Sequence, residues 1–223
     1  MTSRVLTLIR HGRVNFDSRS FRQSPRGRQW DPPLGTAGLE QATLLAARLG
    51  TGDPPEAIWC SPFARCRQTI EPYAESTRVD VHLDERLGEV FVGDWEGKSF
   101  EEIISSDEEL ARKFREQEAM FSMSPGGESG AELRARVLPA IEELLNSTAG
   151  SVYVVAHGGV INAYVATLLG LEQDMFFLPD NTSLNTVVVE DGTPRVRFLN
   201  DVRHLTDPEV FLPQPEPAQP EGP

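Results

Sequence analysis

Short apolar segments that resemble strands alternate with amphipathic segments that resemble helices, and this alternation restricts the fold more than any other feature. Residues 4–9 (RVLTLI) and 151–156 (SVYVVA) are apolar and rich in β-branched residues, which predicts buried strands. A strand buried on both faces needs helices above and below it. The alternation therefore predicts an α/β fold of the three-layer α/β/α sandwich type, with a mostly parallel sheet.

Turn and cap residues set the limits of the other predicted elements, which are strands at 57–60 and 79–83, helices at 36–49, 61–74, 99–118 and 129–145, and an edge hairpin of strands at 186–190 and 195–199. Ser61 followed by Pro62 is typical of a helix start, with the serine as N-cap. The buried face of the first helix is expected to contain Leu39, Ala42, Leu45, Ala46 and Leu49.

The length of 223 residues suits one domain, which we expect at 1–205, with a lid-like insertion at about 99–128. Residues 206–223 contain four acidic residues, six prolines and no basic residue. Such a segment buries too little apolar surface to offset the entropy lost on folding. We therefore expect a mobile tail there.

The net charge of -13 argues against nucleic acid as a partner, because nucleic-acid binding needs a basic surface. No apolar run approaches a membrane span, and the N-terminus does not resemble a signal peptide. Only two cysteines are present, which favours a reducing, cytoplasmic location. Both, Cys60 and Cys66, are expected to be small buried residues. Residues 12–31 reverse the charge balance and are interpreted as a basic loop.

Three polar groups directly follow predicted strands: Arg10-His11-Gly12, Ser61–Arg65 and His157-Gly158-Gly159. The carboxyl ends of parallel strands meet at one edge of a sheet, where ligands bind. A neutral imidazole can attack phosphorus, and arginines with a second histidine can stabilise the transferring group without a metal. A nearby carboxylic acid could protonate the leaving oxygen. The pattern therefore predicts phosphoryl transfer through histidine.

The motifs around these groups resemble those of the histidine phosphatase superfamily, which includes the cofactor-dependent phosphoglycerate mutases. Six motifs occur in the family's order: LIRHG at 8–12, DPPL at 31–34, SPFARCRQT at 61–69, Glu89 followed by GDWEG at 93–97, PGGES at 125–129 and VAHGGV at 155–160. The resemblance implies a phosphoglycerate mutase-like fold and a reaction that needs neither a metal nor another cofactor.

The resemblance also implies roles for individual residues. His11 would be the nucleophile that forms a phosphohistidine, and Glu89 would protonate the leaving group. Arg10, Arg65 and His157 would complete the phosphate pocket. The substrate is further expected to contact Gly12, Arg13, Asp17, Arg22 and Gly158.

Two of these positions depart from the family's pattern. Arg13 stands where the family often has Glu or Gln, and Asp17 stands where it often has an Asn that helps to hold phosphate. A carboxylate beside a phosphate would repel it. Asp17 is therefore expected to orient Arg13 or Arg22, or to bind a substrate hydroxyl.

Two other functions compete with a phosphatase. A phosphoglycerate mutase would return the phosphoryl group to its substrate, and an inactive module would only bind a phospholigand. Mutases are usually longer, whereas this chain spends its last 18 residues on the acidic tail. The presence of all five expected pocket residues opposes the inactive module. The sequence thus favours a metal-independent phosphomonoesterase that acts on a small phosphorylated metabolite.

Overall fold

The computed structural model describes residues 3–105, 112 and 124–205. Its main sheet has six strands in the order β5-β4-β6-β1-β7-β8. Four of them run parallel to one another, and the last two form an antiparallel hairpin at the edge. The strands are β1 (Ser3–Arg10), β4 (Ala57–Cys60), β5 (Val81–Leu83), β6 (Ser151–Ala156), β7 (Leu184–Glu190) and β8 (Thr193–Asp201).

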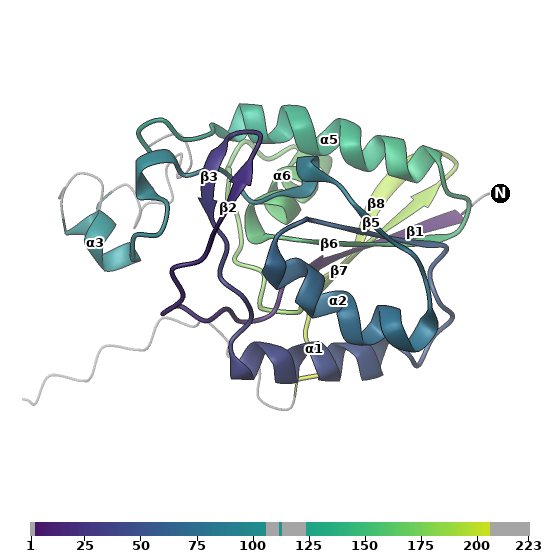
Figure 1. Cartoon of the computed structure of the whole chain (residues 1–223). Helices are drawn as coiled ribbons and strands as arrows, with labels where there is room; N and C mark the ends of the chain where they lie inside the picture. Colours follow the sequence, from purple (N-terminus) through teal and green to yellow (C-terminus); the bar gives the residue numbers. More distant parts are fainter. Residues whose placement is uncertain (1–2, 106–111, 113–123, 206–223) are drawn as a thin grey trace, which may run out of the picture.

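Helices cover both faces of this sheet (Figure 1). One face packs against α1 (Thr36–Leu49) and α2 (Ala64–Thr77), and the other against α5 (Gly130–Asn146) and α6 (Gly158–Leu169). Among the described residues, three shorter helices lie in the connections: η1 (Glu85–Leu87), η2 (Gly93–Trp95) and α3 (Phe100–Ile104). The predicted three-layer α/β/α architecture with a mostly parallel sheet and an edge hairpin is therefore confirmed.

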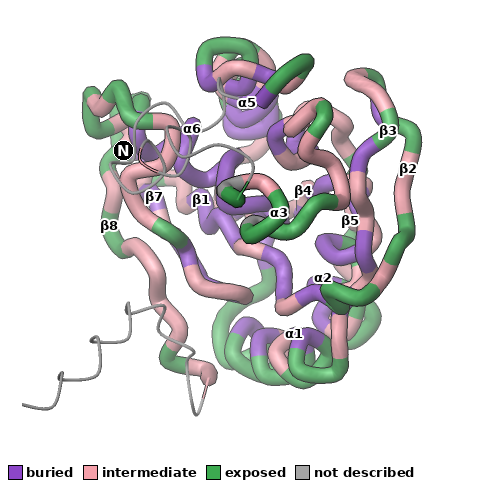
Figure 2. The backbone as a smooth tube through the Cα atoms, turned by 90° about the vertical axis from the view of Figure 1, so that its left-hand side faces the viewer, coloured by how far each residue is buried: buried purple, intermediate pink, exposed green. Residues whose placement is uncertain are grey.

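Alternation of side chains along the central strands builds two cores. Leu6 and Leu8 of β1 pack with α5 and α6, whereas Ile9 packs with α1 and α2. In β6, Val154 joins the first core and Val155 the second. Consecutive side chains of a strand point to opposite faces, so one apolar strand supplies both layers. Figure 2 shows the result, with buried residues gathered in the sheet and exposed residues on the outer turns of α1.

The basic stretch between residues 12 and 31 is not a simple loop, which corrects the sequence-based interpretation. It contains a two-stranded antiparallel hairpin of β2 (Phe21–Ser24) and β3 (Gly27–Trp30). Trp30 fixes its base, because the indole Nε1 donates a hydrogen bond of 2.8 Å to the carbonyl oxygen of Ser18. In Figure 1 the hairpin stands at the end of the molecule that also holds α3.

Several predicted boundaries change. The strand expected at 79–83 forms only over Val81–Leu83, and the helix expected at 99–118 is described only as α3, with a capping box between Ser99 and Glu102. Leu39 is 51% exposed, although it was expected on the buried face of α1. Cys60 and Cys66 are buried and unbridged, as predicted. Most of the insertion at 99–128 and the whole tail at 206–223 lie outside the described residues.

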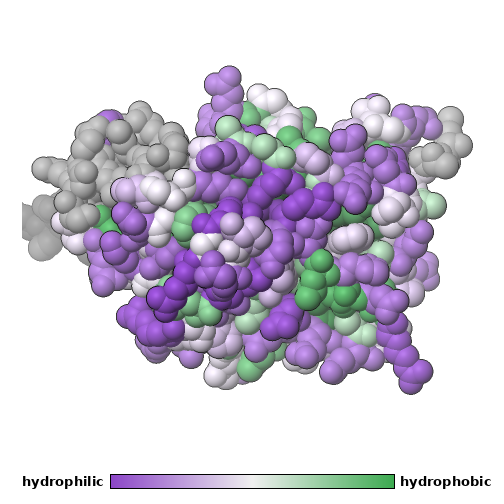
Figure 3. Space-filling model, turned by 45° about the horizontal axis from the view of Figure 1, so that its top comes forward, coloured by the Kyte–Doolittle hydropathy of each residue, from purple (hydrophilic) through white to green (hydrophobic). Residues whose placement is uncertain are grey.

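None of the helices in the described part of the chain is both long and apolar enough to cross a membrane. On the face drawn in Figure 3, hydrophilic side chains predominate and hydrophobic ones form separate patches.

Candidate active site

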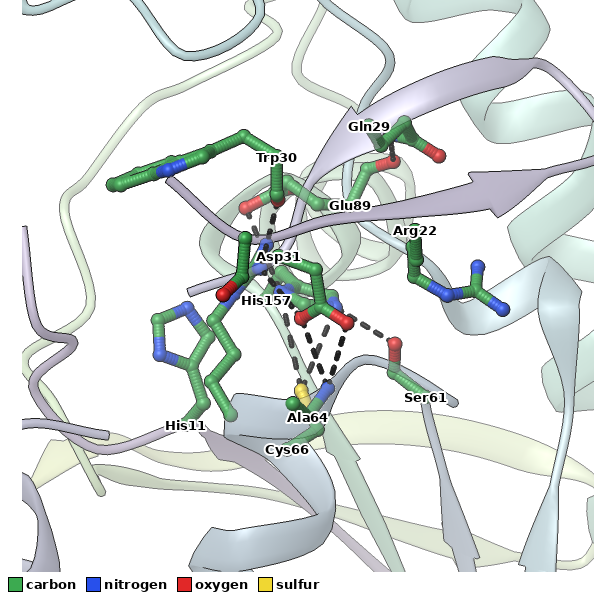
Figure 4. A network of polar contacts seen from close by, with 12 residues as sticks. His11, Arg22, Gln29, Trp30, Asp31, Ser61, Ala64, Cys66, Glu89 and His157 are labelled. Carbon is green, nitrogen blue, oxygen red and sulfur yellow. Dashed lines mark hydrogen bonds and ion pairs between the residues drawn. The ribbon is translucent and has the colours of Figure 1, made fainter. Parts of the chain in front are cut away.

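Strand register brings the two histidines of the predicted site together. β1 pairs in parallel with β6 so that Arg10 lies opposite Ala156. The next residue of each strand, His11 and His157, therefore leaves the sheet at the same level. Their ring centroids are 5.2 Å apart with an interplanar angle of 62°, and both side chains are buried. Figure 4 shows them in the same group of polar contacts as Glu89.

His11 has a defined tautomer. Its Nδ1 lies 2.8 Å from the carbonyl oxygen of Gly12. A carbonyl only accepts, so Nδ1 holds the proton and Nε2 keeps its lone pair. Burial, reinforced by the positive charges of Arg65 and Arg10, holds the pKa of His11 well below its usual value. The ring is therefore neutral near pH 7, as a nucleophile must be.

Arg10 and Arg65 bring positive charge to the same pocket. Arg10 donates through Nη1 to the carbonyl oxygen of Pro179, and its buried Nε has no hydrogen-bond partner among the described residues. Arg65 extends from α2, is 7% exposed, and donates to the carbonyl oxygen of Trp30 (3.2 Å). A buried N–H without an acceptor is costly, so an anionic ligand oxygen would suit Arg10, which lines the pocket.

His157 is the N-cap residue of α6, so the positive end of that helix points into the site. Its Nε2 lies 2.8 Å from the Ser61 hydroxyl and 3.5 Å from the Cys66 sulfur. Its Nδ1 lies 4.0 Å from Oε2 of Glu89. Burial, followed by the charge of Arg65, lowers the pKa of His157 well below its usual value.

Ser61 is not the N-cap of α2, contrary to the sequence-based prediction. The N-cap is Phe63, and the carboxylate of Asp31 accepts from the main-chain N–H of Ala64 at 2.9 and 3.1 Å. Figure 4 shows both arrangements, with Asp31 at Ala64 and Ser61 at His157. Asp31 also forms an ion pair of 3.5 Å with Arg65. One carboxylate thus contacts both the first N–H of α2 and the guanidinium of Arg65.

Glu89 lies in the loop after η1, and its side chain is 26% exposed. Its Oε1 accepts from the main-chain N–H of Val90 at 3.0 Å. Burial raises the pKa of Glu89, and the positive charge of Arg65 opposes this effect. A raised pKa keeps more of the carboxyl protonated near neutral pH, which suits a proton donor.

A pocket of about 290 Å³ is lined by Arg10, His11, Arg65 and Glu89. Beyond the proposed phosphate end, its wall is partly aromatic, with Phe16 and Trp30 at a centroid distance of 6.2 Å. Arg13, Gln29 and Glu96 add polar atoms to the wall. Such a mixture suits a small organic group attached to a phosphate.

The expected substrate-binding residues divide into two groups. Gly12 and Gly158 do not line the pocket but adjoin residues that do: Gly12 follows His11 and its N–H donates to Thr69 Oγ1 at 2.9 Å, and Gly158 lies beside Arg10. Arg13 lines the pocket. Asp17 is exposed and does not line it.

Arg22 does not line the pocket either. Its guanidinium forms a two-point ion pair with Glu85, at 2.6 and 2.9 Å, and lies over the ring of Phe63. Arg22 is therefore paired with Glu85 and not with Asp17, although the sequence made Arg22 one of the partners expected for Asp17.

The sequence did not single out Gln29, Trp30 or Asn181 as site residues. Asn181 donates from Nδ2 to the carbonyl oxygen of His11 at 2.9 Å, which fixes the main chain at His11 from the segment that precedes β7. Gln29 and Trp30 come from the unpredicted hairpin. Asp31 and Ser61 stood inside quoted motifs, but their partners lie more than thirty residues away along the chain.

Among the described residues, no group of three or more His, Cys, Asp or Glu side chains could hold a metal ion.

The histidine phosphatase superfamily (branch 1) model matches residues 6–202. The glucosyl-3-phosphoglycerate phosphatase of Mycolicibacterium vanbaalenii is 33% identical over 182 residues, 78% of each chain. The metal-independent phosphoserine phosphatase of Arabidopsis thaliana is 28% identical over 90% of this chain and 83% of its own. A solved mycobacterial glucosyl-3-phosphoglycerate phosphatase in complex with VO3 is 30% identical, with a TM-score of 0.74 over 88% of this chain and 98% of its own. This chain therefore belongs to the histidine phosphatase superfamily.

Proposed function

We propose that this chain is a metal-independent phosphomonoesterase that hydrolyses a small phosphorylated metabolite through a phosphohistidine on His11. The observation that supports it most is the hydrogen bond from His11 Nδ1 to the Gly12 carbonyl. It leaves an unprotonated Nε2 on a neutral ring that lines a pocket together with Arg10, Arg13 and Arg65, with the ring of His157 5.2 Å from that of His11. The relatives, which include two phosphatases of small metabolites, support the same reaction class.

In the first step, Nε2 of His11 attacks phosphorus and the bond from phosphorus to the ester oxygen breaks. Glu89 gives its proton to that oxygen as the alcohol leaves. Arg10, Arg65 and His157 stabilise the negative charge on the other phosphate oxygens. This step needs Glu89 protonated and His11 neutral, which are the states favoured by their pKa directions.

In the second step, water attacks the phosphohistidine and the bond between phosphorus and nitrogen breaks. The Glu89 carboxylate accepts the proton released by the water, which restores the acid. Inorganic phosphate then leaves, and His11 is neutral again. The same residue acts first as acid and then as base, and no metal is required.

The far part of the pocket suits a leaving group that combines hydroxyls with an apolar face. Trp30 and Phe16 offer aromatic surface, and buried Gln29 presents an Oε1 atom without a hydrogen-bond donor among the described residues. Glu96 adds a carboxylate, whereas Arg13 adds a positive charge on the same wall. The proposal includes a cytoplasmic location and excludes nucleic acid as a substrate, as expected from the composition.

The test is to trap the phosphoenzyme. A phosphohistidine is labile to acid and survives in base, so the protein is mixed with a labelled phosphomonoester and quenched in alkali. We expect label on the wild type and none on His11→Ala, with turnover reduced by about a thousandfold or more. His82→Ala changes an exposed histidine stacked on Trp59 and serves as the control. Normal turnover by His11→Ala would refute the mechanism.

Two further measurements separate the alternatives. Assays of phosphate release and of conversion of 3-phosphoglycerate to 2-phosphoglycerate distinguish a phosphatase from a mutase. We expect phosphate release to dominate and EDTA to leave it unchanged. Strong inhibition by EDTA would indicate a metal enzyme.

A further inference from the structure

One arginine ties the loop that contains Glu89 to the helix layer. Arg136 lies on α5, with its side chain 12% exposed. Its Nη1 donates to the carbonyl oxygens of Arg86 (2.6 Å) and Gly88 (2.8 Å), and its Nη2 to that of Glu89 (3.2 Å). These carbonyls lie at Glu89 and just before it. The position of that stretch of main chain therefore depends on a side chain of α5.

A buried carboxylate fixes the orientation of this guanidinium. Glu128, 6% exposed, accepts from Arg136 Nε at 2.6 Å and from Nη2 at 2.8 Å. It also accepts from the N–H of Phe91 (3.2 Å) and donates its own N–H to the Phe91 carbonyl (2.7 Å). All five N–H groups of Arg136 are thereby used, three on the Glu89 loop and two on Glu128. Lysine cannot reproduce this planar fork.

The carboxyl of Glu89 depends on this support because its own contacts are few. It accepts one hydrogen bond from the neighbouring Val90 N–H, and the next group is His157 Nδ1 at 4.0 Å. Its main-chain carbonyl is held by Arg136 from α5 and by Gln29 from β3, at 3.3 Å. Proton transfer requires the donor within about 2.6–3.2 Å of the leaving oxygen, so a displacement of about 1 Å would matter.

We propose that Arg136, oriented by Glu128, is the positioning residue of the proton donor. The proposal rests on the proposed role of Glu89. Arg136 does not line the pocket, so it acts on the reaction through the Glu89 loop. Its loss should therefore slow reactions that need a proton on the leaving group and spare those that do not.

Two aryl esters of similar shape provide this distinction. The leaving group of p-nitrophenyl phosphate departs without a proton, whereas that of phenyl phosphate is more basic and benefits from one. The quantity compared is kcat/KM, which covers the steps up to the phosphohistidine. For Glu89→Gln we expect a loss of about a hundredfold with phenyl phosphate and only a few-fold loss with p-nitrophenyl phosphate. For Arg136→Lys we expect kcat/KM to fall by about tenfold with phenyl phosphate and by less than about threefold with p-nitrophenyl phosphate.

The matched control is Arg134→Lys on the same helix. Arg134 also donates to main-chain carbonyls, those of Glu172 (3.0 Å) and Gln173 (3.2 Å), and forms an ion pair with Asp174 at 3.3 Å. These partners are remote in sequence from the Glu89 loop. The control should therefore lower the melting temperature without changing the ratio between the two substrates.

The outcomes distinguish the proposed role of Glu89 as proton donor from the proposed role of Arg136 in positioning it. A selective loss with phenyl phosphate in both Glu89→Gln and Arg136→Lys supports the proposal. Selectivity in Glu89→Gln but equal losses on both substrates in Arg136→Lys overturn this proposal alone. No selectivity in Glu89→Gln overturns the role of Glu89 and this proposal together. If Arg136→Lys does not fold, Glu128→Gln replaces it, because glutamine keeps an acceptor for Phe91 but loses the charged fork; equal losses there also overturn the proposal.

Discussion

At the scale of single residues, charge and burial work together in the pocket. His11 and His157 are neutral because burial and the adjacent arginines disfavour a second positive charge. Glu89 has a raised pKa because the surrounding protein desolvates its carboxyl, although the positive charge of Arg65 opposes this. The pKa shifts of His11 and Glu89 thus favour the two protonation states that the first step of the proposed reaction requires.

The pH dependence of the rate should expose Glu89. The acid form is needed with an alkyl phosphomonoester, so kcat/KM should fall as pH rises through the pKa of Glu89. Because that pKa is raised, the fall should begin at a higher pH than for an ordinary glutamate. The ionisation of the substrate affects all variants equally. The ratio of kcat/KM for the wild type to that for Glu89→Gln therefore reports the titration of Glu89 alone. A ratio that does not change with pH would contradict this assignment.

The free energy of unfolding should fall on acidification, and the cause is the pair of histidines His11 and His157. Below about pH 6.5 the unfolded chain protonates His11 and His157, whereas the folded chain holds both neutral because their pKa values are lowered. The free energy of unfolding should therefore decrease as pH falls, by up to about 1.4 kcal/mol per pH unit for each histidine.

Urea unfolding between pH 5.5 and 7.5 measures this slope. His157→Gln should reduce it by up to half, while His82→Gln, at an exposed position, serves as the control. The raised pKa of Glu89 acts in the opposite direction, since it favours the folded state at low pH. An unchanged slope in His157→Gln would mean that this histidine is not held neutral by the fold.

At the scale of elements, the start of α2 depends on a residue from another segment. Asp31 takes the place of the absent side-chain cap at Ala64 and also contacts Arg65. Asp31→Ala should lower the free energy of unfolding by about 1–2 kcal/mol, because it removes the acceptor for the first N–H. Asp31→Asn should restore part of this, since an amide oxygen still accepts. Urea denaturation measures both, with exposed Asp53→Ala as the control.

The approach of α1 to the end of β1 leaves no space for a methyl group. A Cβ on Gly38 would lie 2.0 Å from the carbonyl oxygen of Arg13. Gly38→Ala should therefore displace α1 or Arg13, cost about 1–3 kcal/mol of stability and raise KM. Gly52 has no atom within 4 Å of such a Cβ, so Gly52→Ala should change stability by less than about 0.5 kcal/mol. Equal effects of both substitutions would refute the packing argument.

Local patterns predicted most elements but not the hairpin of β2 and β3. The strands of the main sheet are apolar and bounded by turn residues, so their local composition is enough to predict them. FRQS and GRQW are short and polar, and contacts made elsewhere hold them, such as Gln29 with the Glu89 carbonyl. Ser61 was misassigned for a similar reason. Its sequence context is typical of a cap, but its partner, His157, is brought near only by the pairing of β4 with β6.

At the scale of the whole molecule, charge is distributed unevenly. The net charge is -13, yet Arg10, Arg13 and Arg65 line the pocket. Interactions beyond about 8 Å are largely screened at physiological salt, so the local charges should decide substrate binding. Truncation after Leu205 removes four acidic residues and no basic ones, and it should change kcat/KM by less than about twofold at 0.15 M salt. A larger increase on truncation would show that the tail repels the substrate.

The place of β1 in the sheet also affects how the protein is made. β1 is made before the other strands of the main sheet, but its two neighbours, β6 and β7, come from residues 151–156 and 184–190. During synthesis at about 5–20 residues per second, an apolar strand therefore waits with both edges unpaired, and such edges are prone to aggregation. Chaperone binding is expected at this stage. The enzyme also cannot act before β7 has been made, so a chain terminated before residue 184 should have no partial activity.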